Sequence, residues 1–191
     1  IYSPQILESN YYDDYSFISM SGRTFLNYSS PPNSFPTADF LQCKGLLSGK
    51  AVAAINADGS PGYQYSAFYY DGLQQLIQTR SDSHRGGYEV KYVEHTYLGK
   101  PKRIYTTHTD VRGPVSELLV YTYDHAERVT RLTHQLNDGT VRVLYDNIYD
   151  QLGRVEYRNI LGQATLSTHY TYNIQSAMKS ITTGNLFKEE L

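Results

Sequence analysis

The chain has 191 residues, a formal net charge of −2 at pH 7 and a single cysteine, Cys43. This length suffices for one domain, or for one domain with an appendage. The small net charge gives no electrostatic reason to expect a nucleic acid or an anionic membrane as partner, and one cysteine excludes an intramolecular disulfide. No apolar stretch approaches the roughly 20 residues of a membrane-spanning helix, and no signal peptide is recognisable.

Residues 1–36 differ in composition from the rest of the chain. They contain an aromatic and acidic cluster, Tyr11 to Tyr15, and a stretch rich in serine and proline, Ser29 to Pro36. A stretch of the second kind is typical of a loop or linker. We therefore predict an irregular N-terminal segment with a Pro-rich linker at 1–36 and a repeat-containing β-sheet domain at 37–191.

From residue 70 onward, a Tyr-Asp motif recurs about every 25 residues, and its fullest copy reads YDQLGRV from Tyr149 to Val155. Such a period indicates stacked supersecondary units. The first position of the motif is held by Tyr70, His95, Tyr123, Tyr149 and Tyr172. The second position is held by Asp71, Thr96, Asp124, Asp150 and Asn173. The fifth is held by Gln74, Gly99, Glu127, Gly153 and Ser176, and the sixth by Gln75, Lys100, Arg128, Arg154 and Ala177.

The spacing within the motif predicts a tight hairpin turn. Asp or Asn at the start of the turn can accept a backbone N–H, and Gly three residues later tolerates a left-handed backbone, so the strand reverses in a three-residue loop. Gln74 and Glu127 replace this glycine, and a left-handed backbone there costs about 1–2 kcal/mol. We therefore expect those two turns to be looser or differently shaped. Tyr12-Asp13 is a weaker candidate for a further copy, because no Gly or Arg follows at the expected offsets.

A second turn signal lies between consecutive motifs, so each repeat is predicted to be a pair of strands. These signals are Asp58-Gly59, Gly86-Gly87, Asp110 to Gly113, Asn137 to Gly139, Asn159 to Gly162 and Thr183-Gly184. The stretches between turns are rich in Tyr, Val and Thr, which favour strands, and several alternate as a half-buried sheet requires. The 20 tyrosines suit a partly solvated sheet, and no long helical apolar stripe is present. The sequence therefore predicts an all-β antiparallel meander of about ten strands.

These motifs resemble the Rhs or YD-repeat family, which includes bacterial Rhs toxins, the C components of insecticidal toxin complexes and animal teneurins. The resemblance covers roughly residues 45–187 and is strongest from Tyr149 to Val155. It implies a strongly twisted open sheet or half-barrel that forms part of a larger spiral shell, with other repeats of the same parent chain as partners. In bacterial members of the family, such a shell encloses a C-terminal effector or toxin.

The resemblance implies a structural, non-enzymatic segment of a shell wall in a secreted or cell-envelope-associated protein. The family's C-terminal signature for self-cleavage has no match here, and no part resembles a toxin domain. The chain begins at Ile1 without a methionine and ends at Leu191 in mid-pattern, as expected of an internal segment. Because a sheet cut from a larger one has open edges, we also expect that the isolated chain can form a homodimer.

Catalytic and metal-binding interpretations are weaker. The six histidines lack the short paired spacing typical of zinc sites; they are His84, His95, His108, His125, His134 and His169. Lys44 beside Cys43 could activate the thiol, but no His or Asn context marks a nucleophile. Asp71, Asp124 and Asp150 could be paired with Glu94 or Glu156 as glycosidase carboxylates. An active site needs one such constellation, whereas a turn residue is needed in every copy. We predict no catalytic residue, metal site or cofactor.

The basic residues after the turn, Lys100, Arg128 and Arg154, either pair with neighbouring acidic residues or form an anion-binding row. The alternative function is a carbohydrate- or protein-binding module at the cell surface, because tyrosines flanked by Asp, Asn and Arg also suit glycans. The direction of the tyrosines separates the two hypotheses. An exposed aromatic strip favours glycan binding, and tyrosines packed against their neighbours favour a scaffold.

Overall fold

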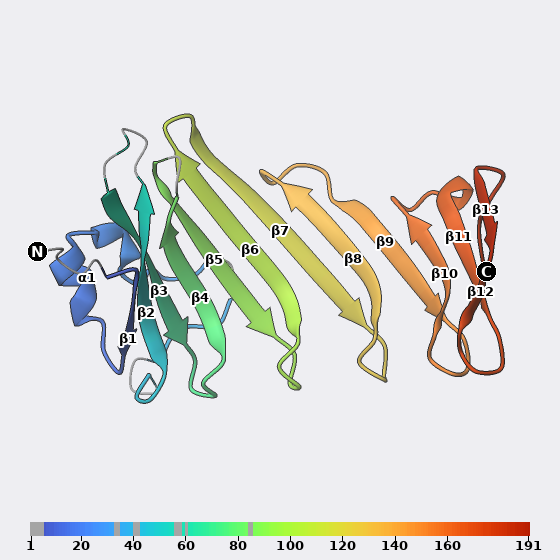
Figure 1. Ribbon diagram of the computed structural model, residues 1–191, viewed down its shortest axis with the longest axis horizontal. Coiled ribbons are helices and arrows are strands. Elements are labelled where there is room, and N and C mark those ends of the chain that lie inside the picture. The colour runs from blue at the N-terminus through green and yellow to red at the C-terminus, as the bar shows by residue number, and fades with distance from the viewer. Residues whose placement is uncertain (1–5, 33–34, 40–42, 56–58, 60, 84–85) are drawn as a thin grey trace, which may run out of the picture. The chain divides into compact units, whose positions relative to one another are not determined.

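The computed structural model describes residues 6–32, 35–39, 43–55, 59, 61–83 and 86–191. Within these residues, thirteen strands form an open antiparallel meander in which each strand is hydrogen-bonded to its neighbours in sequence (Figure 1). The strands are β1 (Glu8–Tyr12), β2 (Leu47–Ile55), β3 (Pro61–Tyr70), β4 (Leu76–Asp82), β5 (Tyr88–His95), β6 (Pro101–Asp110), β7 (Gly113–Tyr123), β8 (Val129–Leu136), β9 (Arg142–Tyr149), β10 (Val155–Ile160), β11 (Ser167–Tyr172), β12 (Met178–Thr183) and β13 (Phe187–Glu190). The predicted all-β antiparallel meander is confirmed.

Helices are short in the described part of the chain. The helix α1 (Ser16–Ser21) and the 3-10 helix η1 (Thr24–Leu26) belong to the N-terminal segment, and a further 3-10 helix, η3 (Ala164–Leu166), precedes β11. None of the helices in the described ranges is long and apolar enough to cross a membrane.

The meander has more strands than the about ten expected, and the first of them lies in a segment predicted to be irregular. Strand β1 pairs with β2, with Glu8 opposite Val52 and Tyr12 opposite Leu47. Because the intervening residues 13–46 separate the two strands in sequence, no local hairpin signal marks β1. The proposed division of the chain near residue 36 stays a prediction. The chain forms two compact units, residues 1–117 and 118–191, whose boundary falls within β7.

In the first unit, the apolar core lies between the N-terminal segment and the sheet. It consists of Phe17 and Ile18 of α1, Leu26 of η1, and Ala67 and Tyr69 of β3. The Phe17 ring lies so close to Gly49 of β2 that a Cβ at that position would overlap it. The N-terminal segment therefore covers one face of the first strands.

In the second unit, the buried positions are largely polar. Among its described residues, the buried side chains include Leu132, Asn147 and Thr168. The Asn147 amide donates to the Val129 carbonyl at 3.0 Å and accepts from Arg158 Nε at 2.9 Å. The hydroxyls of Thr168 and Thr183 lie 2.9 Å apart on neighbouring strands. Cross-strand polar pairs therefore contribute much of the contact in this unit.

Candidate functional site

The five motif copies form the same hairpin turn. The N–H of Asp124 donates to the Arg128 carbonyl at 3.0 Å, and the N–H of Glu127 donates back to the Asp124 carbonyl at 3.0 Å. The turns that begin at Asp71, Thr96, Asp150 and Asn173 have the same two bonds, at 2.6 to 3.1 Å. This is the three-residue loop that the motif spacing predicts, with a left-handed residue at its end.

The expectation that Gln74 and Glu127 give looser turns is wrong. Their φ angles are 61° and 57°, in the same left-handed region as the 79° of Gly99 and the 81° of Gly153. Ser176 is a third residue other than glycine at this position, with φ 64°. The main-chain bonds and side-chain caps of the turn therefore outweigh the roughly 1–2 kcal/mol that a left-handed side-chain-bearing residue costs.

The side chain at the second motif position caps the loop. In the first copy, Asp71 Oδ1 accepts the N–H groups of Leu73 and Gln75, both at 2.9 Å. In the last copy, Asn173 Oδ1 accepts those of Gln175 and Ala177 at 2.9 and 3.0 Å. A carboxylate and an amide oxygen thus fix the same loop, because each accepts two N–H groups that would otherwise be unpaired.

Asp124 makes the same two bonds and adds a third. Its Oδ1 accepts the N–H groups of Arg128 and Ala126 at 2.9 Å, and its Oδ2 accepts Arg128 Nε at 2.7 Å. The pKa of Asp124 is lowered to about 2, because the main-chain and side-chain donors of Arg128 stabilise the ionised carboxylate, with a smaller contribution from Ala126. The donors of its own turn thus hold this carboxylate in its charged form.

Asp150 repeats the arrangement in the fullest motif copy. Its Oδ1 accepts the N–H groups of Leu152 and Arg154 at 2.9 Å, and its Oδ2 accepts Arg154 Nε at 2.7 Å. Partial burial raises the pKa of Asp150, but the hydrogen bonds and charge of Arg154 outweigh it, so that the pKa is lowered. Arg128 and Arg154 therefore pair with the turn aspartates, which was one of the two alternatives for the basic row.

The hydroxyls of three motif tyrosines donate hydrogen bonds to main-chain carbonyls of the preceding repeat. The Tyr149 hydroxyl donates to the Val129 carbonyl at 2.8 Å, and the Tyr172 hydroxyl donates to the Val155 carbonyl at 2.8 Å. In each case the acceptor is the first strand residue after the preceding turn. Tyr70, in the first unit, makes the equivalent bond and donates to the Leu47 carbonyl at 2.8 Å. These hydroxyls are used within the sheet.

Arginine joins consecutive repeats in the second unit. The guanidinium carbon of Arg128 lies 4.5 Å from the ring centre of Tyr149, and that of Arg154 lies 4.6 Å from the ring centre of Tyr172. Arg154 Nη1 also donates to Ser176 Oγ at 3.2 Å in the following turn. We call this set the repeat clasp: the turn aspartate, its arginine, the tyrosine of the next copy and the carbonyl that this tyrosine bonds.

The copy around His95 lacks the clasp side chains. Gln75 holds the arginine position before it, and Thr96 holds the aspartate position, where Thr96 Oγ1 accepts the Lys100 N–H at 3.2 Å. Burial lowers the pKa of His95, and the Asp71 carboxylate counteracts part of that effect. Tyr123 ends β7 with a partly buried ring, and burial raises its pKa. This joint keeps the turn but not the arginine and tyrosine pair.

Among the described residues, no cluster of three or more His, Cys, Asp or Glu is placed to hold a metal ion. His84 and Asp58 lie outside the described residues. Burial raises the pKa of the Cys43 thiol, which donates to the Asp13 carbonyl at 3.0 Å, so this thiol is not activated.

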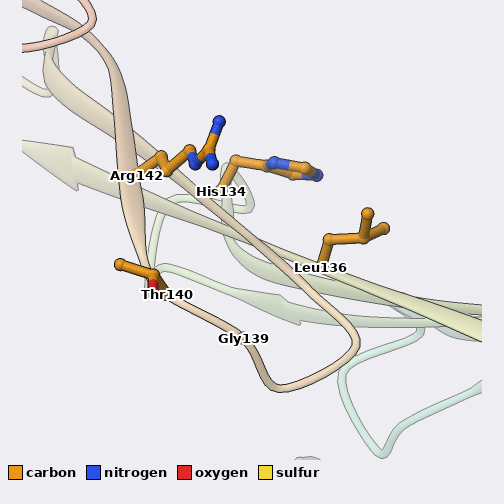
Figure 2. A pocket seen from close by; sticks show the side chains of 5 residues that line it. All are labelled: His134, Leu136, Gly139, Thr140 and Arg142. Carbon is orange, nitrogen blue, oxygen red and sulfur yellow. The ribbon is translucent and has the colours of Figure 1, made fainter.

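A surface cavity that the sequence did not predict lies at the hairpin between β8 and β9. Its volume is about 350 Å³, and it is lined by His134, Leu136, Gly139, Thr140 and Arg142. Figure 2 shows His134 and Arg142 side by side, as their direct pairing across the two strands requires. Leu136 is half exposed, at 50% of its full accessibility. The cavity is therefore open to solvent and offers two groups able to contact an anion.

Sequence reasoning also missed the polar side chains on the covered face of the first unit. Gln78 and Arg80 of β4 are almost fully buried and bond the main chain of the N-terminal segment. Neither belongs to the repeat motif. The one clue in the sequence was an arginine, Arg80, within a strand. This clue could not be interpreted without knowing where the N-terminal segment lies.

Comparisons with known proteins give structural similarities and no family assignment. No protein-family model and no curated protein sequence matches the chain. Sixteen chains of solved structures match it. One of them belongs to the crystal structure of TcdB2-TccC3-Cdc42, with a TM-score of 0.37 and 11% sequence identity. The matched region covers 71% of this chain and 8% of the other, so the chain spans a small part of that protein's length.

Proposed function

We propose that this chain is a structural segment of a large Rhs-like repeat protein, in which it forms part of the wall of a β-shell around a C-terminal effector or toxin. The observation that carries the proposal is the repeat clasp. Arg154 bonds Asp150 of its own copy while it covers the Tyr172 ring of the next copy. A contact that joins consecutive repeats, as this one does at the Arg128–Tyr149 and Arg154–Tyr172 joints, is what a continuous wall needs.

The clasp also supports a role without catalysis. The carboxylates that resembled glycosidase residues, Asp71, Asp124 and Asp150, each accept two main-chain N–H groups of their own turn. One oxygen of each carboxylate is thus used to cap its own turn, and a recurring turn cap explains their repetition. We therefore propose a non-enzymatic protein, and from the resemblance to the YD-repeat family we propose that it is secreted or associated with the cell envelope.

Glycan binding at the motif tyrosines is less well supported. A sugar stacks on a free aromatic face, but Arg128 covers a face of Tyr149 and Arg154 covers a face of Tyr172. Both hydroxyls donate to main-chain carbonyls. Titration with a glycan panel, followed by the NMR resonances of the tyrosine rings, would favour the alternative if those of Tyr149 and Tyr172 shift.

Self-association of the isolated chain is proposed from the two terminal strands. All four residues of β13 are exposed, and β1 pairs on one side with β2. Unpaired strand edges can add a further strand. Sedimentation velocity over a range of concentrations would reveal a dimer, and a monomer at every concentration would contradict this part of the proposal.

The wall proposal is tested by limited proteolysis of a longer natural chain that contains this segment. A closed wall protects the sequence C-terminal to the segment in the native state, and urea exposes it to the protease. The matched control is the same C-terminal sequence produced alone, which should be cut in both conditions. Rapid cleavage in the native longer chain would instead indicate an open sheet that encloses nothing.

A further inference from the structure

Asp13 and residues 45–46 form the two ends of one repeat turn, and residues 14–44 separate these ends in the sequence. The Asp13 N–H donates to the Leu46 carbonyl at 3.3 Å, as the Asp124 N–H does to the Arg128 carbonyl. Gly45 is left-handed, with φ 80°, like the residue before Arg128. Tyr70 then bonds the Leu47 carbonyl as Tyr149 bonds that of Val129. Tyr12-Asp13 therefore resembles a motif copy whose loop carries a long insertion, residues 14–44, which we call the strap. Two details differ from the other copies: Asp13 is itself left-handed, with φ 70°, and the Gly45 N–H donates to Asp13 Oδ1 rather than to the Asp13 carbonyl.

Besides the apolar core and an ion pair between Arg23 and Asp82, the strap contacts the sheet through its main chain. The Tyr69 hydroxyl donates to the Leu26 carbonyl at 2.6 Å. Arg80 Nε donates to the Phe25 carbonyl at 2.5 Å, and Gln78 Nε2 donates to the Ser29 carbonyl at 3.1 Å. Three side chains from two neighbouring strands thus contact three carbonyls within residues 25–29 of the strap.

The three donors are deeply buried. The exposed fractions of Tyr69, Gln78 and Arg80 are 1%, 1% and 7%. Burial raises the pKa of Tyr69 to about 12, so its hydroxyl stays protonated and remains a donor. A buried guanidinium is tolerated only when its N–H groups find acceptors. Arg80 finds neutral ones, the Phe25 carbonyl and the Ser29 hydroxyl, both supplied by the strap.

One acceptor in this set is unused. Gln78 Oε1 is buried and has no hydrogen-bond partner among the described residues, although the Nε2 of the same amide bonds the strap. A buried amide oxygen without a partner is unfavourable. The described part of the strap, which bonds the Nε2 of this amide, supplies no N–H to its oxygen. The face can therefore offer both donors and an acceptor to a main chain.

We propose that Tyr69, Gln78 and Arg80 form a binding site for the main chain of a polypeptide, and that strap residues 25–29 fill this site in cis. Carbonyl acceptors occur in every residue, so the three donors set the position of the ligand rather than its sequence. Contacts between aromatic rings give the site a preference for ligands with aromatic residues. Phe25 stacks on Tyr88 with ring centres 5.2 Å apart, and Tyr28 meets the edge of Tyr69 at 5.4 Å. The ligand class is a short segment with aromatic residues flanking its turn.

The first test uses the intact chain and trypsin cleavage after Arg23, which lies in the strap. Replacing Arg80 with Met removes the charged donor, and the cleavage rate should rise about tenfold as the strap opens more often. The matched control is Thr79→Val, because Thr79 points to the opposite face of the same strand. Circular dichroism checks that the sheet remains. An unchanged cleavage rate in Arg80→Met would overturn the proposal.

The second test supplies the ligand in trans. Residues 14–44 are replaced by Gln-Leu, which copies the loop between Asp150 and Gly153, and a fluorescent peptide of residues 14–32 is titrated. We expect saturable binding that Arg80→Met weakens about tenfold and that Thr79→Val leaves unchanged. Absence of binding to the folded variant would refute the site. If the variant does not fold, the cleavage test on the intact chain decides.

A third test replaces one backbone atom of the peptide and so distinguishes recognition of the main chain from packing of side chains. An ester in place of the amide between Ser29 and Ser30 weakens the Ser29 carbonyl as an acceptor and changes no side chain. The affinity of this peptide for the loop-replaced protein that keeps Gln78 should fall about fivefold. The same ester should have no further effect in Gln78→Leu, whose donor is absent. Equal losses in both proteins would show that Gln78 does not bond this carbonyl.

Discussion

Arg128 lies 4.5 Å from the ring centre of Tyr149 in the next repeat, while its Nε bonds Asp124 in its own repeat. One side chain therefore connects the cap of a turn to the aromatic residue that follows it by two strands. Arg154 repeats this relationship with Asp150 and Tyr172. The recurrence explains the role of arginine directly after the left-handed residue in these two copies: its Nε reaches the aspartate and its guanidinium group lies over the tyrosine ring.

Replacing Arg128 with Met should lower the free energy of unfolding by about 1 kcal/mol, because the ring contact and the bond to Asp124 are both lost while the aliphatic stem is kept. Urea denaturation measures the change. The double variant with Tyr149→Leu should lose less than the sum of the single changes, since the two residues contact each other. Arg131→Met is the control: Arg131 pairs with Asp146 at the surface and should matter little. Strict additivity would contradict the clasp.

Gly153 and Gly99 provide a matched pair for measuring the contact with Arg128. Both are left-handed, so Ala at either position should destabilise the chain by about 1 kcal/mol. At Gly99 an added Cβ meets open space, whereas at Gly153 it would lie 2.9 Å from Arg128 Nη1. Gly153→Ala should therefore lower the thermal midpoint more than Gly99→Ala does. Equal shifts would mean that Arg128 moves aside without cost.

Gln74 offers the reverse change. It is left-handed with φ 61°, at a position where other copies have glycine. Gln74→Gly removes the strain of about 1–2 kcal/mol but makes the unfolded chain more flexible, so a net stabilisation of about 0.5–1 kcal/mol is expected. Urea denaturation measures this gain. The control is Leu73→Gly in the same loop, which carries only the entropy cost and should destabilise; a loss of stability in both variants would show that Gln74 is not strained.

The repeated part of this fold could be predicted from the sequence because its signals are local. The loop from Asp150 to Arg154 is specified by residues within five positions, and the strands between turns follow from their composition. The equality of the Gln74, Glu127 and Gly153 turns could not be predicted, since propensity disfavours a left-handed backbone in the first two. Caps and main-chain bonds outweigh that preference, and their strength is visible only when the whole loop is seen.

The remaining features depend on contacts between residues distant in sequence. Strand β1 needs β2, which comes after the strap, so Tyr11 and Tyr12 gave no hairpin signal. Tyr12-Asp13 was a weak motif candidate because its glycine, Gly45, follows the inserted strap instead of two loop residues. Arg80 likewise found its partners in the strap. Such contacts require the path of an irregular segment over the sheet, which periodicity does not encode.

The pH dependence of stability should contain a contribution from Asp124. Its pKa in the folded chain is about 2, below the ordinary 3.8, because Arg128 donors favour the charged form. A lowered pKa stabilises the fold at pH values above the pKa of the unfolded chain, and this stabilisation is lost as the pH falls from about 4 to about 2.

Asp124→Asn keeps an oxygen that can cap the loop, as Asn173 does in its own turn, but removes the charge. The thermal midpoint of the original chain should therefore exceed that of Asp124→Asn at pH 7, and the difference should shrink on acidification until it disappears near pH 2. Melting curves of both proteins at several pH values measure this difference. A gap that stays constant from pH 7 to pH 2 would show that the carboxylate charge contributes nothing to the clasp.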